Sequence, residues 1–504
     1  MRRQPTDHPL LYEINTRLWV REIAGPQGNR ALDRVPQGAL DAIARLHFDF
    51  VWLMGVWQTG PQGKAIALKL PQLRSEYAHV LPNWTPDDVL GSPYAVQDYR
   101  VADELGGPEP LRRLRVRLAE RGIRLILDFV PNHTARDHPW VWSHPEFYIH
   151  GSEDDLRREP ENFFLAETAH GKKVLACGRD PYFPPWTDTA QLNYGHAGMR
   201  AAMIETLLGI AAHSNGVRCD MSMLVLEEIF ARTWGEKAMP ADGTSPAHGE
   251  FWSEAIDAVR RKYPEFLFIA EAYWDLESRL QSLGFDYTYD KTLYDSLLRK
   301  DAKQVREHIG RDPDFHRKSV HFLENHDEPR AAQVFTAARH RAAALIAYTL
   351  PGIRLFHEGQ LDGRRVRVPI QLGRRPAEEP EREVRAFYEK LLAALGDNAM
   401  RRGRWKLLEP KPAAGAGSTH EQILIHRWEG DGHDARVIAA NYGSQPARCF
   451  APLDLTGLRG SRVTLRDRLS EDAFERDGSE LCDPGLFLDL APYESHLFAV
   501  SWRD

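Results

Sequence analysis

Amphipathic segments alternate with short apolar runs through the first four hundred or so residues of the chain. In "GALDAIARLHFDFVWLMGV", Leu40, Ile43 and Leu46 recur at helical spacing before the apolar run at residues 50–54. The same plan returns in "PLRRLRVRLAERGIRLILDFV", "MRAAMIETLLGIAAHSNGVRCDM" and "FWSEAIDAVRRKYPEFLFIAEAYW". Because apolar residues at this spacing form one helical face, and a short apolar run is typical of a buried strand, each segment predicts a helix followed by a strand.

Four more apolar runs, in "LLYEINTRLWV", "FDYTYD", "SVHFLENHD" and "IRLFHEGQ", bring the number of predicted strands to eight. Repeated alternation of strands and helices indicates a parallel sheet covered by helices. Eight such units over roughly 400 residues predict an α/β fold, a (β/α)₈ TIM barrel. The alternative, an open doubly wound sheet, would carry a glycine-rich turn after its first strand, and none follows here.

Two stretches interrupt this rhythm. A segment rich in Pro, Trp, Tyr and Phe follows the third strand and is too long for a structureless loop, so it predicts an inserted subdomain. After about residue 400, short alternating runs such as "ILIHRW" and "ARVIAANYG" predict a C-terminal antiparallel β-sandwich. The predicted units are a first barrel part over residues 1–132, an inserted subdomain over 133–197, a second barrel part over 198–402 and a β-sandwich over 403–504.

Composition narrows the function classes. With 42% hydrophobic and 27% charged residues, the chain has the profile of a globular protein and not of a disordered one. Its net charge of −7, without a basic stripe, argues against a nucleic-acid partner. The N-terminus has polar residues where a signal peptide has an apolar core, and no run is long enough to span a membrane, so we expect a cytoplasmic protein with no membrane partner. The four cysteines show no disulfide or zinc spacing.

Charged side chains gather where the predicted strands end. They are Asp128 and His133 after the third strand, Arg218 and Asp220 on the fourth, Glu271 after the fifth, and His326 and Asp327 after the seventh. In a barrel, the carboxyl ends of all strands meet at the active face. Cleavage of a glycosidic bond needs one carboxylic acid to protonate the leaving oxygen and one carboxylate on the other side of the sugar. The set therefore predicts glycoside hydrolysis.

Four stretches, in order, resemble the conserved regions of the α-amylase family of glycoside hydrolases: "DFVPNH", "GVRCD", the "AE" that closes the fifth strand, and "ENHD". "GSPYAVQDY", "FVWLMGV" and "LPGIRLFHEGQ" support the match, which covers essentially the whole chain. The resemblance implies a retaining α-glycosidase that acts on α-glucosidic oligosaccharides or disaccharides. The reaction would pass through a covalent glycosyl-enzyme intermediate.

The resemblance also implies a role for each residue. Asp220 looks like the nucleophile, Glu271 like the general acid/base, and Asp327 like the acid that grips sugar hydroxyls and stabilises the transition state. The other residues look like substrate-binding groups: Arg218, which would orient Asp220; His133 and His326, which would bind hydroxyls; Tyr94, which would stack beneath the sugar; and Asp128, which would bridge to this network.

The chain departs from the family pattern in two places. Gln191 stands where many relatives carry an acidic calcium ligand, and a neutral amide offers a hard cation little. We therefore expect no metal and no cofactor, calcium included. Met223 and Leu224 stand where many relatives carry a basic or histidine pair, which implies an apolar leaving-group side and argues against long-chain endo-amylase binding.

Other functions compete with hydrolysis. A transglycosylase or an isomerising α-glucosyltransferase would use the same residues and the same intermediate. A catalytically silent carbohydrate-binding barrel would be expected to have lost one of the three acids, and none is missing. A barrel lyase or phosphate-handling enzyme would carry a glycine-rich loop near the last two strands, which this chain lacks.

Overall fold

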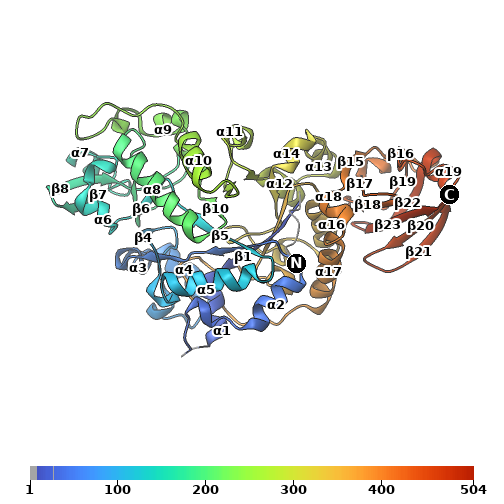
Figure 1. Cartoon of the computed structure of the whole chain (residues 1–504), viewed down its shortest axis with the longest axis horizontal. Coiled ribbons are helices and arrows are strands. Elements are labelled where there is room, and N and C mark those ends of the chain that lie inside the picture. Colours follow the sequence, from blue (N-terminus) through green and yellow to red (C-terminus); the bar gives the residue numbers. More distant parts are fainter. Residues whose placement is uncertain (1–7, 26–27, 504) are drawn as a thin grey trace.

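Eight parallel strands close into a barrel in the computed structural model, which describes residues 8–25 and 28–503 (Figure 1). In order around the barrel they are β1 (Leu10–Asn15), β14 (Ile353–His357), β13 (Ser319–His321), β12 (Tyr287–Tyr289), β11 (Leu267–Ala270), β10 (Gly216–Cys219), β5 (Arg124–Phe129) and β2 (Phe50–Met54). All eight predicted strands are present, which confirms the predicted (β/α)₈ barrel.

Amphipathic helices cover the outside of the barrel. They include α2 (Gln37–Arg45), α5 (Pro108–Ala119), α8 (Ala197–His213), α10 (Phe251–Lys262), α12 (Lys291–Arg299), α16 (Ala337–Tyr348) and α17 (Arg382–Leu395). On α5, Leu111, Leu114 and Leu118 are each 1% exposed, and full burial of one such side chain stabilises the fold by about 1.5–3 kcal/mol. Within the ranges 8–25 and 28–503, no helix combines the length and apolar character needed to cross a membrane.

The strand register decides which side chains meet at the carboxyl face. Cys219 of β10 pairs with Ala270 of β11, and the residues that follow them are Asp220 and Glu271. Since paired residues of neighbouring strands lie side by side, these two acids leave the barrel at the same level. On the other side of β10, Arg218 pairs with Asp128 of β5.

The segment between β5 and α8 forms a small lobe at one end of the molecule (Figure 1). It contains β6 (His133–Ala135), α6 (Pro139–Ser143), α7 (Glu153–Arg158), β7 (Phe163–Thr168), β8 (Gly171–Ala176) and β9 (Thr189–Gln191). β6 pairs antiparallel with β9, and β7 with β8. The predicted limits of the subdomain fall at the first residue of β6 and at Ala197, the first residue of α8.

Two antiparallel sheets form the C-terminal part, at the opposite end of the molecule from the inserted lobe (Figure 1). One has the order β15 (Arg404–Leu408), β17 (Ile423–Glu429), β18 (Asp434–Asn441), β23 (Ser495–Arg503), β20 (Arg462–Asp467) and β21 (Ala473–Asp477); the other has the order β16 (Lys411–Pro412), β19 (Ala447–Ala451) and β22 (Leu486–Leu490). Their apolar faces share a buried core, as predicted for a β-sandwich. Trp428 Nε1 donates to the carbonyl of Thr349, 2.7 Å away, and so joins this part to the barrel.

Candidate active site

Arg218 holds two carboxylates that come from neighbouring strands. Its Nη1 donates a hydrogen bond to Asp220 Oδ1 at 2.6 Å, and its Nη2 lies 2.9 Å from Glu271 Oε2. The second contact has ion-pair distance but not hydrogen-bond alignment, so Nη2 is without a hydrogen-bond partner among the described residues. All three side chains are at least nine-tenths buried. One guanidinium therefore binds the two acids unequally.

Glu271 is fixed by two further donors. The backbone N–H of Met221 donates to Oε2 at 2.6 Å, and the Tyr273 hydroxyl lies 2.7 Å from Oε1. Met221 has φ 40° and ψ 49°, a left-handed conformation that costs a non-glycine residue on the order of 1 kcal/mol. This turn directly after Asp220 is what aims the Met221 N–H at Glu271, so strain in the backbone is coupled to the position of the acid.

A second chain of contacts runs from the first strand to the last of the three acids. Glu13 Oε1 of β1 lies 2.5 Å from His326 Nδ1, and His326 Nε2 lies 3.1 Å from Asp327 Oδ2 and 2.8 Å from the Tyr94 hydroxyl. Glu13 and His326 are buried, whereas the Asp327 side chain is 46% exposed. Asp327 is therefore the acid of this group that faces the open end of the barrel.

Charges around His326 set its protonation state. Burial by itself lowers the pKa of His326, but the carboxylates of Asp327 and Glu13 outweigh burial and hold this pKa well above 6.5. For Asp327, burial alone raises the pKa, but the charge of His326 and its hydrogen bond outweigh burial and lower this pKa to about 2. At neutral pH an imidazolium thus stands between two carboxylates.

Burial prevails over the opposing charges at the two acids that Arg218 holds. It raises the pKa of Asp220 and of Glu271, and the Arg218 charge opposes the rise in both. The aligned hydrogen bond from Arg218 favours the ionised form of Asp220 specifically. Asp220 and Asp327 both repel a negative charge on Glu271. Burial and the mutual repulsion of the carboxylates therefore raise the pKa of both acids and favour a proton on one of the two.

Asp128 lies beneath this network and is held by the barrel itself. Its Oδ1 accepts from Trp52 Nε1 at 3.0 Å, and its Oδ2 accepts from the Gly55 N–H at 2.9 Å. Burial raises the pKa of Asp128 to about 6, although the Arg218 charge lowers it. The Arg218 guanidinium lies 5.2 Å from both the Trp52 and the Tyr94 ring centroids, so these groups form one continuous layer.

His133 joins the inserted lobe to the site. Its Nδ1 lies 3.3 Å from Asn132 Nδ2, and its ring centroid is 5.1 Å from that of Trp186. Burial lowers the pKa of His133 to about 4, against a hydrogen bond with the Tyr94 backbone, so the ring is neutral at pH 7. With this contact, all eight residues predicted for the site belong to one connected set.

Asn132 and Gln191 make a buried amide pair where β6 meets β9. Gln191 Nε2 donates toward three oxygens: the Asn132 carbonyl at 2.9 Å, Asn132 Oδ1 at 3.0 Å and the Leu192 carbonyl at 3.1 Å. Asn132 Nδ2 returns a bond to Gln191 Oε1 at 3.1 Å. An amide nitrogen thus occupies the centre of an oxygen cluster of the kind that binds hard cations.

An aromatic rim reaches over the carboxyl face from the inserted lobe. Tyr182, 60% exposed, packs edge-to-face on Trp274 with centroids 4.9 Å apart, and its hydroxyl accepts from Arg232 at 3.1 Å. Trp274 follows Glu271 by three residues and has φ 65°. Exposed rings beside a carboxylate acid are surfaces on which sugar faces stack.

One expectation from the sequence needs correction. Met223 and Leu224 are 0% and 3% exposed, so they belong to the barrel core and offer no surface to a leaving group. Met221, which directly follows Asp220, is only half-buried. Of the acids around "ENHD", Glu324 binds Arg330 at 2.6 Å and Glu328 lies 3.3 Å from Lys291; both are held by cations outside the site.

Sequence reasoning missed Glu13 and Tyr273. Glu13 carried a signal: it is the single charged residue inside the apolar run of the first strand, where an acid is costly unless it meets a cation. Its position alternates with Tyr12 and Ile14, so it points into the barrel with Leu11. Tyr273 carried no such signal, because its contact with Glu271 depends on the loop conformation.

The chain is similar in sequence to known proteins. The family model described as "Alpha amylase, catalytic domain" matches residues 38–407. Alpha-amylase MalA of Haloarcula japonica is 25% identical over 483 residues, which cover 90% of this chain and 59% of that protein. Maltase 1 of Drosophila virilis is 23% identical over 328 residues, which cover 53% of this chain and 49% of that protein. The chain thus spans between about half and six-tenths of the length of these two relatives.

Solved structures show the same architecture. The crystal structure of the maltogenic α-amylase AmyB from Thermotoga neapolitana superposes with a TM-score of 0.69 at 18% sequence identity, and the match covers 98% of each chain. At this identity the similarity shows a shared fold.

Proposed function

Because the chain belongs to the α-amylase family of glycoside hydrolases, we propose that it is a retaining α-glycosidase acting on α-glucosidic oligosaccharides or disaccharides. The observation that carries this proposal is the single guanidinium of Arg218, which binds Asp220 through one nitrogen and contacts Glu271 through the other. An inverting pair stands about 6.5–9.5 Å apart to admit a water between acid and base, whereas a retaining pair stands about 5–5.5 Å apart. Two carboxylates on one guanidinium favour the shorter separation.

In the proposed first step, a carboxylate oxygen of Asp220 attacks the anomeric carbon and the bond from that carbon to the leaving oxygen breaks. Glu271 gives its proton to the leaving oxygen, so the leaving sugar departs neutral. Asp327, at the mouth, grips hydroxyls of the sugar while positive charge develops on its ring. The electron pair of the broken bond stays on the leaving oxygen, and the sugar is now an ester of Asp220.

In the second step, ionised Glu271 takes a proton from water while the water oxygen displaces Asp220 from the anomeric carbon. Two displacements at one carbon restore the α configuration. If a sugar hydroxyl replaces water, the same step is a transglycosylation. The exposed Tyr182 and the half-buried Trp274 form the surface on which such an acceptor would stack, so the balance between the two outcomes depends on these loops.

No step in this mechanism uses a metal. The catalytic charges are supplied by Arg218, His326 and the three acids, and the oxygen cluster beside Gln191 is already filled by an amide nitrogen. We therefore propose that turnover does not require calcium.

The test is the stereochemistry of the first product. Incubation with maltose, other α-linked disaccharides and maltooligosaccharides, followed by proton NMR before mutarotation, should show the α anomer, and chromatography of the same samples should separate hydrolysis from transfer products. A β anomer would exclude the retaining mechanism. Absence of turnover on every α-linked substrate would exclude the glycosidase itself.

A further inference from the structure

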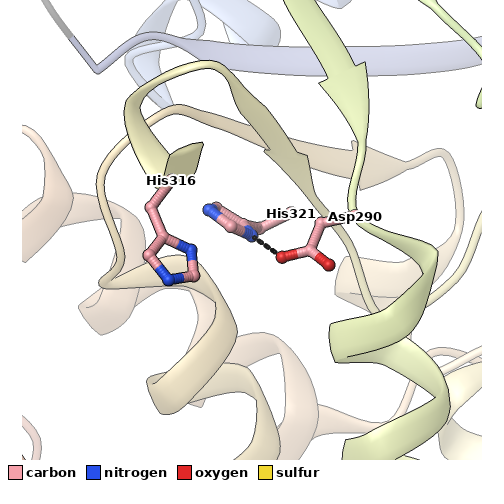
Figure 2. Close-up of side chains that lie close together, drawn as sticks. All are labelled: Asp290, His316 and His321. Carbon is pink, nitrogen blue, oxygen red and sulfur yellow. Dashed lines mark ion pairs between the residues drawn. The ribbon is translucent and has the colours of Figure 1, made fainter. Parts of the chain in front are cut away.

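A second cluster of titratable side chains lies where β12, β13 and α14 meet (Figure 2). Asp290 follows β12 and caps α12, His321 is the last residue of β13, and His316 belongs to α14 (Pro313–Arg317). Figure 2 shows the three side chains turned toward one another. They are 2%, 0% and 0% exposed, so water does not compensate their polar atoms.

Each of the two imidazoles has one nitrogen in a hydrogen bond and one nitrogen without a hydrogen bond. His316 Nε2 lies 3.1 Å from the Ile309 carbonyl, and His321 Nε2 lies 2.8 Å from the Pro351 carbonyl. A carbonyl only accepts, so each Nε2 carries a proton, and in a neutral ring the lone pair is then on Nδ1. Both Nδ1 atoms are buried and lack a hydrogen-bond partner among residues 8–25 and 28–503.

The carboxylate of Asp290 is oriented by its own partners. Leu293 N donates to Oδ1 at 3.0 Å, and His308 Nε2 lies 2.9 Å from the carboxylate. His321 Nδ1 lies 3.4 Å from Oδ2, near enough for an ion pair but without hydrogen-bond alignment. Two imidazole nitrogens without hydrogen bonds among the described residues therefore lie in one buried group with the Asp290 carboxylate.

The spacing of the candidate ligand atoms suits a small cation. One candidate ligand atom from each of the three residues lies within 4.8 Å of the other two, so a point exists within about 2.8 Å of all three. Zinc bonds to nitrogen and carboxylate oxygen are about 2.0–2.2 Å long, so each ligand would move inward by less than about 1 Å.

We propose that Asp290, His316 and His321 form a zinc site that ties β12 and β13 to α14. Two imidazole nitrogens with a carboxylate oxygen suit zinc, whereas calcium and magnesium prefer all-oxygen sets. The Ile309 and Pro351 carbonyls supply the outer hydrogen bonds that fix metal-binding histidines in position. The sequence prediction of no metal site considered the cysteines and the calcium position, and this spacing of ligands forms no recognised motif.

The test compares the full-length protein with two histidine variants. In His316→Gln, the amide can keep the bond to the Ile309 carbonyl but offers no imidazole lone pair. In the control His150→Gln, the replaced ring also bonds a backbone carbonyl, that of Pro145 at 2.9 Å, but lies in the inserted lobe. Metal-free samples are titrated with Zn²⁺ by calorimetry and with Co²⁺ by visible absorption, and Tm is recorded with and without Zn²⁺.

Wild type and His150→Gln should bind one Zn²⁺ tightly, show cobalt ligand-field bands and gain on the order of 2 °C in Tm with excess Zn²⁺. His316→Gln should lose at least about tenfold in zinc affinity. Equal affinity in all three proteins, or no cobalt bands in wild type, would overturn the proposal. If His316→Gln does not fold, anomalous diffraction from zinc-soaked wild-type crystals decides: a peak between Asp290 and His321 supports the site, and peaks at the surface only overturn it.

Discussion

Two charged clusters contain residues of the loop after β13, and they differ in how many of their polar atoms have hydrogen-bond partners. The closed cluster is Glu324, Arg330 and His357: Glu324 Oε1 accepts from Arg330 at 2.6 Å, Oε2 accepts from the Ala331 N–H at 2.7 Å, and Arg330 Nη1 also meets His357 Nδ1 at 2.8 Å. Each of its three members is buried. The charged groups of this cluster are therefore paired with one another.

The open cluster is Glu13, His326 and Asp327. Glu13 Oε2 has no hydrogen-bond partner within the part of the chain that the structure describes, and Asp327 is 46% exposed. Next to it, Arg218 Nη2 is also without an aligned acceptor. Buried polar atoms normally have hydrogen-bond partners. Two buried atoms without such partners beside an exposed acid therefore indicate where a ligand is expected to bind. Residues two positions apart in "ENHD" thus serve different purposes, which sequence position alone does not separate.

The largest effect should follow from removing the nucleophile. Asp220→Asn keeps the size of the side chain and the contact with Arg218 but cannot form the ester, so kcat should fall by at least about 10³-fold while Tm stays close to that of wild type. Steady-state kinetics on the best α-linked substrate and a thermal melt measure both. Retention of a tenth of the wild-type rate by a clean preparation would take the nucleophile role from Asp220.

The closed cluster should behave in the opposite way. Glu324→Ala leaves the guanidinium of Arg330 buried without its carboxylate, which costs about 3–5 kcal/mol of folding free energy. Calorimetry should show a strongly lowered Tm, while kcat/KM per folded molecule should remain near that of wild type. A loss of turnover as large as that of Asp220→Asn, at unchanged Tm, would place Glu324 in the active site and erase the contrast between the clusters.

Asp220 and Glu324 show which parts of the site the sequence predicts and which it does not. Each catalytic acid closes an apolar strand, and the barrel rule places such residues on one face, so the order of motifs was enough to bring Asp220 and Glu271 together. The sequence could not divide the acids of "ENHDE" between the two clusters, because the division depends on which cation each one meets in space. The strands β19 and β22 were missed for a related reason, since short runs such as "ARCFA" become strands only through their partners.

A smaller effect should come from Glu13, and it should depend on pH. The pKa of His326 is raised, so its positive charge is fully present below the ordinary value of 6.5 and is lost as pH rises through the raised value. Glu13→Gln removes one of the two carboxylates that raise it. The alkaline limb of kcat/KM against pH should move to lower pH, and activity on the alkaline side should fall on the order of tenfold.

Glu324→Gln is the matched control for this profile, because it makes the same neutral replacement in the closed cluster. Its alkaline limb should coincide with that of wild type. An unmoved limb in Glu13→Gln would show that the Glu13–His326 contact is only structural.

The smallest effect concerns the oxygen cluster beside the open site, where an amide stands in for a cation. Wild-type turnover should survive exhaustive chelation, because Gln191 Nε2 already satisfies the Asn132 and Leu192 oxygens. Gln191→Glu replaces this donor with a carboxylate that faces the same oxygens. In the presence of a chelator, this change should lower the free energy of unfolding by about 1–3 kcal/mol. Added Ca²⁺ should restore the lost stability, since carboxylate and carbonyl oxygens are its preferred ligands.

Thermal melts with chelator and with Ca²⁺ separate this effect from a general response to charge. Gln304→Glu is the control, because Gln304 lies exposed on α13 (Ala302–Ile309) and its replacement adds the same charge away from the oxygen cluster. Only Gln191→Glu should have a Tm that depends on Ca²⁺. If wild type also loses turnover on chelation and recovers it with Ca²⁺ alone, the amide nitrogen does not replace the cation. The inserted lobe would then depend on a metal to hold His133 against the open site.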